Sequence, residues 1–261
     1  MKQWLLQVSA LSKLSILELY RRKDLAVVFL LALIILLPLA FLAPPFGVSG
    51  ASRYVSELAM MLIWLFSVII GLGVSARLFP PEFESRTIYP LLAKPVGRGT
   101  VLLGKYLGAL TASASALLVF YLAYAVLVGV RQGEWFAPVL FQAALLHVGF
   151  LIVITALTLL GSLVMTPSAA LTLCALTAVG MLAFGQRLPS LAAAQTGPGR
   201  WVLLAIHWIA PHLEFFDVRQ RLVHAWPCVE WRVCTAVLAY AVCYAGLCLA
   251  LAGWAFRRKR L

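Results

Sequence analysis

Charged side chains are scarce in this sequence, and acidic ones are the scarcest. Only 11% of the 261 residues are charged, with nine Asp and Glu against 21 Lys and Arg, whereas 63% are hydrophobic. A soluble fold of this length could not bury so much apolar surface. The net charge of +12 does not indicate nucleic-acid binding, because the basic residues flank apolar runs instead of alternating with stacking aromatics. The composition therefore predicts an integral membrane protein.

Cysteine is also sparse and provides no disulfide framework. The five cysteines are an odd number, and three of them lie inside apolar runs. Cys228 and Cys234 could approach an oxidising face, but their spacing of six does not stack them on one side of a helix. We expect no structural disulfide.

A cleavable signal peptide is not expected at the N-terminus. Basic residues precede an apolar run, as in a signal peptide, but the run at 25–46 is too long and has no clear small-x-small cleavage site. We interpret this run as an uncleaved first span.

Long intervals without Asp, Glu, Lys or Arg indicate the membrane spans. A helix needs about 20 apolar residues to cross a bilayer. Five windows qualify, and the one at 135–186 is long enough for two helices joined at 165–168. We therefore predict an all-α polytopic membrane protein whose residues 1–261 form one transmembrane domain. The six expected spans are 25–44, 58–76, 107–130, 138–163, 168–185 and 233–256.

The distribution of basic residues predicts the orientation. With the N-terminus inside, 14 Lys and Arg fall in cytoplasmic segments and seven in outer segments. Five of those seven lie in one long loop, where the positive-inside rule has least force. We expect both ends of the chain in the cytoplasm.

Residues 1–24 are predicted to form an amphipathic helix on the inner membrane surface. Trp4, Val8 and Leu11 share one helical face, although Glu18 interrupts the apolar stripe. The alternative is a cytoplasmic extension of the first span.

The outer segment 187–232 contains an apolar piece that is too short to span a bilayer, which favours an interfacial or re-entrant helix between spans five and six. Tryptophans here suit headgroup depth, and an aromatic ligand cage is the alternative. The expected interfacial anchors of the chain are Lys105, Trp201, Trp208, Arg257 and Arg258.

The connection at 77–105 between the second and third spans carries the most specific pattern. Pro80 and Pro81 end one helix and can open another, and Glu82 and Glu84 fall in its first turn, where carboxylates complement the helix dipole. Glu82 and Arg86 have the favourable four-residue spacing. A short surface helix is expected, with apolar residues that could fill a partner's groove: Ile88, Leu91 and Leu92.

Residues 99–106 match most of the phosphate-loop pattern G-x-x-x-x-G-K-[ST]. Tyr106 stands where the magnesium-binding hydroxyl belongs, and no parallel sheet is expected around it. We therefore reject nucleotide binding here and interpret Lys105 as a snorkelling interfacial anchor.

This connection resembles the first cytoplasmic loop of type-2 ABC exporter permeases, the ABC-2 family. The matching residues are Glu84, Thr87, Leu91, Leu92, Pro95, Arg98, Gly104 and Lys105. Arg86 departs from the pattern because the family usually has glycine there, and Pro90 is unusual inside the helix. The six-span plan, the surface helix and the outer hairpin extend the resemblance over nearly the whole chain.

The resemblance implies a coupling helix that docks into a cytoplasmic ABC ATPase, with Glu84 as its electrostatic anchor. The residues expected to couple to the ATPase are Glu82, Glu84, Arg86, Thr87, Ile88, Leu91, Leu92, Pro95 and Arg98. It further implies a dimer with a second permease copy or paralogue in a bacterial-type inner membrane. No cofactor is expected in this chain, because ATP and magnesium would bind the partner ATPase. The alternative is that these residues form an ordinary solvated loop.

Three other functions remain as alternatives. A secondary transporter or channel needs ionisable groups at mid-membrane, where only His147 and Gln142 are strongly polar. A membrane enzyme would need a site in the outer segment, for example a metal held by His212, Glu214 and Asp217. A membrane anchor for an ATPase that transports nothing has the same sequence features as a permease. The uncharged spans favour lipidic, hydrophobic or peptide-like cargo over a simple ion.

Overall fold

A computed structural model of the chain describes residues 2–21, 30, 51–85, 96–132 and 138–258. These residues form helices joined by short turns and contain no strand. Five helical stretches among them are long and apolar enough to cross a membrane. The prediction of an all-α polytopic membrane protein is confirmed. The helices that match predicted spans are α3 (Ala51–Ala76), α6 (Arg98–Gln132), α7 (Pro138–Val164), α8 (Pro167–Phe184) and α12 (Trp231–Arg258). The span predicted at 25–44 lies outside the described residues.

Two helices begin well before the predicted spans. α3 starts at Ala51 instead of residue 58, and α6 starts at Arg98 instead of residue 107. Hydropathy marks the apolar interval only, whereas backbone hydrogen bonding continues through flanking polar residues. Arg98 to Lys105 therefore belong to α6, and the connection predicted at 77–105 is shorter than expected.

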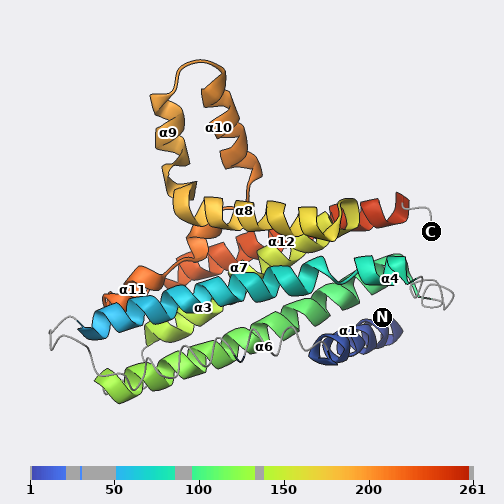
Figure 1. Ribbon diagram of the computed structural model, residues 1–261, viewed down its shortest axis with the longest axis horizontal. Helices are drawn as coiled ribbons and strands as arrows, with labels where there is room; N and C mark the ends of the chain where they lie inside the picture. The colour runs from blue at the N-terminus through green and yellow to red at the C-terminus, as the bar shows by residue number, and fades with distance from the viewer. Residues whose placement is uncertain (1, 22–29, 31–50, 86–95, 133–137, 259–261) are drawn as a thin grey trace.

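The long helices run side by side along one axis (Figure 1). α7 lies in the centre and packs against α3, α6, α8 and α12. Its most apolar stretch is 67% buried, compared with 22% for α12, so α12 leaves most of its surface to lipid or a partner. The short helix α4 (Pro80–Glu84) and both ends of the chain lie at the same end of the bundle.

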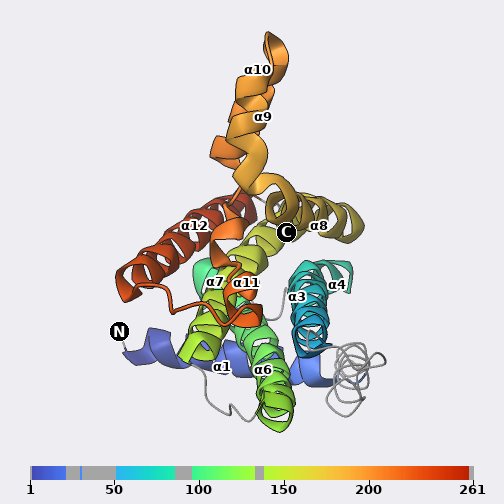
Figure 2. The same cartoon turned by 90° about the vertical axis from the view of Figure 1, so that its left-hand side faces the viewer.

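The N-terminal helix α1 (Lys2–Arg21) lies across α6 (Figure 2). The two backbones approach closely where α6 has glycine on two successive turns. A Cβ on Gly104 would come within 2.5 Å of the Leu11 Cβ, and a Cβ on Gly108 within 2.6 Å of the Ser15 Cβ. This is the small-xxx-small packing that lets membrane helices touch.

A helical hairpin leaves the bundle where α8 ends. The 3-10 turn η1 (Gly185–Arg187) leads into α9 (Leu188–Ala194) and α10 (Pro198–Ile209), which project at a steep angle to the spans (Figures 1 and 2). Gly197 takes the turn between them with a φ of 88°, a conformation that favours glycine. The segment predicted at 187–232 is helical, and its depth in the bilayer stays a prediction.

The chain then returns to the bundle through η2 (Leu213–Phe216) and α11 (Arg219–Val223). η2 packs against α7, and α11 packs against α3 and α7. Phe216 fills the space above Gly149 of α7, where an added Cβ would come within 2.8 Å of the ring. The base of the hairpin is therefore tied to the centre of the bundle, and the Ile209 carbonyl at the end of α10 accepts a hydrogen bond from the Tyr244 hydroxyl of α12 at 3.2 Å.

Candidate functional site

α4 follows α3 and begins at the double proline, as the sequence predicts. Two prolines occupy its first turn, where a missing backbone donor costs nothing. Glu82 lies in that turn, and Ser85 closes the helix, with its hydroxyl donating to the Pro81 carbonyl at 2.6 Å. The chain is thus redirected at the end of a span, which gives a short rigid element at this end of the bundle.

A buried ion pair joins α4 to α6. The Lys105 ammonium lies 2.6 Å from the Glu82 carboxylate and donates to the Leu78 carbonyl at 2.9 Å. It also sits over the Phe79 ring, 5.1 Å from the ring centre. The Lys105 side chain is only 5% exposed. We predicted that Lys105 would snorkel to the headgroups, but in the structure its ammonium faces the protein, because Glu82 of α4 and the preceding residues Leu78 and Phe79 surround it.

A cluster of three phenylalanines joins α4 to the last turns of α12. Phe79 and Phe256 are fully buried, with ring centres 5.4 Å apart, and Phe83 lies 5.9 Å from Phe79 and 6.2 Å from Phe256. These separations are in the range of favourable aromatic packing. Movement of α4 would therefore disturb both α6 and α12.

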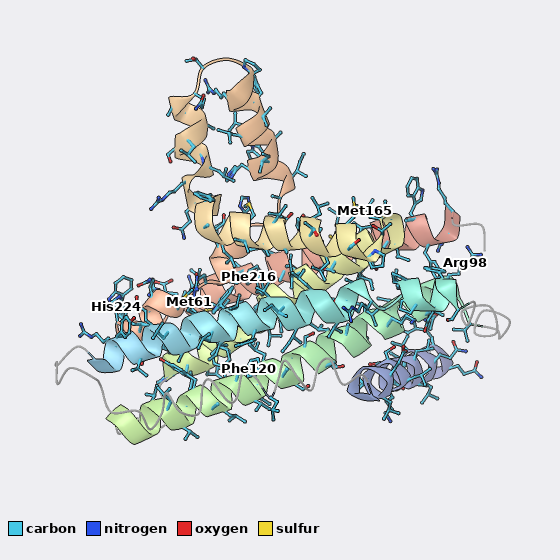
Figure 3. The ribbon with its side chains drawn as sticks, viewed as in Figure 1. Met61, Arg98, Phe120, Met165, Phe216 and His224 are labelled. Carbon is cyan, nitrogen blue, oxygen red and sulfur yellow. The ribbon has the colours of Figure 1, made fainter. Side chains whose placement is uncertain are left out.

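Arg98 completes the junction between α6 and α12. Its guanidinium donates to the carbonyls of Phe256 at 3.1 Å and Arg257 at 3.0 Å. The last carbonyls of a helix lack intrahelical partners, and a cation there complements the dipole. Figure 3 shows Arg98 at the end of the bundle opposite Met61 and His224. Arg98 thus holds α6 to the C-terminal end of α12.

The structure brings together only some of the residues that were predicted to couple to the ATPase. Glu82 and Arg98 lie at this junction, and Glu84 is the last residue of α4. The following predicted residues lie outside the described part of the chain: Arg86, Thr87, Ile88, Leu91, Leu92 and Pro95. Their role stays a prediction.

Sequence reasoning missed the aromatic part of the site. Phe79 and Phe83 flank the double proline, and this spacing could have indicated an apolar face on α4. No local signal linked them to Phe256, which lies far away in the sequence. Arg257 and Arg258 end α12 at this junction, whereas Trp201 and Trp208 are 72% and 79% exposed on the projecting hairpin.

The polar residues considered for ion coupling are engaged within the bundle. His147 is fully buried, 2.6 Å from the Ser67 hydroxyl and 3.3 Å from the Tyr121 hydroxyl. Gln142 donates to the Val229 carbonyl and accepts from the Val229 amide, each at 2.9 Å. Both side chains therefore connect elements of the fold, as polar residues in membrane helices commonly do.

The residues considered for a metal site separate into two pairs. His212 Nδ1 lies 3.0 Å from the Glu214 carboxylate, whereas Asp217 binds the Arg219 guanidinium through both oxygens, at 2.8 and 2.6 Å. Within the described residues, no three His, Cys, Asp or Glu side chains are grouped to hold a metal ion.

The fold and these contacts define a multi-pass helical membrane protein. Its short helix α4, which follows the span α3, is held against two other spans, α6 and α12. The model of the ABC-2 family of transporter proteins matches residues 5–261. The chain therefore belongs to this family and is the permease component of an ABC transporter. A search of the curated proteins gives no match to the chain.

Proposed function

We propose that this chain couples ATP hydrolysis by a separate ABC ATPase to the export of a substrate. The observation that supports this proposal is the fastening of α4 to α6 and α12 through the Glu82–Lys105 ion pair and the Phe79–Phe83–Phe256 cluster. A partner that grips α4 and the residues after it would move two spans at once. A solvated loop would need no such attachment.

The partners follow from the same proposal. Two permease subunits, identical or paralogous, would face each other in the inner membrane, with two ATPase subunits below them. ATP and magnesium would bind to the ATPases, and this chain would bind no cofactor. The junction would lie on the cytoplasmic side, together with both termini, which agrees with the excess of Lys and Arg in the predicted cytoplasmic segments.

The Glu84→Lys variant tests this proposal. Glu84 ends α4, and reversing its charge should repel a basic residue of the ATPase, since like charges at a contact oppose association. We expect the variant to reach the membrane in normal amounts and to lose co-purification with its partner ATPase. The measurement is a pull-down from solubilised membranes, normalised to the amount of permease.

Glu230→Lys is the matched control. Glu230 is an exposed acid that precedes α12 at the opposite end of the bundle from α4. The same reversal there should leave the ATPase bound. Equal recovery of the ATPase with Glu84→Lys and with the control would contradict the coupling assignment.

A further inference from the structure

An apolar groove runs between α6 and α12 near the end of the bundle that carries α4. It has a volume of about 520 Å³, within the range of about 300–1,000 Å³ that is usual for small-molecule sites. Leu102 of α6 and Leu249 of α12 lie along its walls, and Trp254 and Arg257 lie toward the end of α12.

Glycines keep this groove open. A Cβ added to Gly99 or Gly246 would meet no atom within 4 Å, and one added to Gly253 would meet only the Leu102 side chain at 3.7 Å. These glycines therefore do not serve a close approach of helices, unlike Gly104 and Gly108. Their effect is to leave a channel between two spans that a flexible apolar chain can fill.

Positive charge gathers at one end of the groove. Arg257 lines it, and the Arg258 guanidinium stacks over the Trp254 ring, 3.8 Å from the ring centre. Arg98 approaches the same turn of α12 through its bonds to the Phe256 and Arg257 carbonyls. None of the described residues that line the groove carries a carboxylate. Its charged end therefore favours an anion, whereas its apolar walls favour hydrocarbon.

We propose that this groove binds one anionic phospholipid, with an acyl chain between α6 and α12 and the phosphate at Arg257. Basic pockets between spans on the cytoplasmic side are suited to acidic lipid headgroups. Assigning the lipid to the inner leaflet rests on the orientation proposed above, but the recognition of the lipid does not. The exposed Trp254 ring would lie beside the headgroup, where indole rings are favoured.

Native mass spectrometry of the purified full-length permease, without ATPase, tests this site. We expect phosphatidylglycerol to bind more tightly than phosphatidylcholine with the same acyl chains. Arg257→Gln should weaken phosphatidylglycerol binding about fivefold, since one basic residue near a lipid surface contributes about 1 kcal/mol, and should leave phosphatidylcholine binding unchanged. Arg200→Gln removes an exposed arginine from α10 and should change neither lipid.

A second pair of variants tests the part of the groove that would hold the acyl chain. Gly246→Leu fills the groove from a position with no neighbouring atom and should weaken both lipids. Gly180→Leu adds the same side chain at an equally open position on α8 and should weaken neither.

Two results would overturn the proposal. One is equal affinity of the two lipids together with no effect of Arg257→Gln. The other is a change of oligomeric mass in Gly246→Leu with lipid binding intact, which would make the groove a contact between two copies. Both results are independent of the ATPase pull-down, so either proposal can fail without the other.

Discussion

Lys105→Met should lower the free energy of unfolding by about 3 kcal/mol, the lower end of the cost of breaking a buried ion pair. Methionine keeps much of the length of the side chain but removes the ammonium that binds Glu82 and the Leu78 carbonyl. The Glu82 carboxylate then stays in a largely buried site, and its Oε2 already has no hydrogen-bond partner among the described residues. Glu82 is 20% exposed, so water can offset part of the loss. Denaturant unfolding in mixed micelles, followed by tryptophan fluorescence, measures the effect.

The double variant Glu82→Gln/Lys105→Met measures the interaction energy of the ion pair separately from the stability lost through each single substitution. Because no unpaired charge is left buried, we expect the double variant to be more stable than Lys105→Met alone, with a coupling energy of about 1–3 kcal/mol. Lys13→Met removes an exposed lysine from α1 and should change stability by less than about 0.5 kcal/mol. Additive effects of the two single substitutions would show that Glu82 and Lys105 do not interact as the structure indicates.

Gly104→Ala and Gly108→Ala should each separate α1 from α6 at a cost of about 1–3 kcal/mol, as expected for overpacking. The added methyl group would lie 2.5 Å from the Leu11 Cβ in one variant and 2.6 Å from the Ser15 Cβ in the other. At Gly108 it would also lie 3.0 Å from the Ser12 carbonyl oxygen, which is backbone and cannot rotate away. Limited trypsin digestion at Lys13, together with unfolding in mixed micelles, measures the release of α1.

Gly73→Ala is the control for this pair. Gly73 lies in α3, and a Cβ there would meet no atom within 4 Å. Alanine favours helix over glycine by about 0.8–1.0 kcal/mol, so the control should be as stable as the parent or more so. Faster cleavage of α1 in the control, or unchanged cleavage in both test variants, would contradict the packing of α1 on Gly104 and Gly108.

The candidate site could be predicted in part. The double proline, the acid in the first turn and the preceding apolar interval are local features, and they predicted where α4 begins. The helix was expected to carry Ile88, Leu91 and Leu92, but α4 ends at Glu84 and those residues lie outside the described part of the chain. The partners of Glu82 and Lys105 could not be predicted in the same way. We expected Glu82 to contact Arg86 or the ATPase and Lys105 to reach the headgroups, but the two side chains bind each other across α4 and α6.

The sequence by itself determined the class of protein, and it located five apolar intervals that each coincide with a long apolar helix of the described residues. These depend on transfer of apolar side chains into hydrocarbon and on backbone chemistry within a few residues, both of which can be evaluated along the chain. Only the tertiary structure decided which glycines mark a close crossing and which keep a groove open. It also decided that Phe256 packs on Phe79 and that Arg98 binds the end of α12. Such contacts depend on which helices are neighbours, and hydrophobicity does not specify neighbours, since lipid and another helix solvate an apolar side chain about equally well.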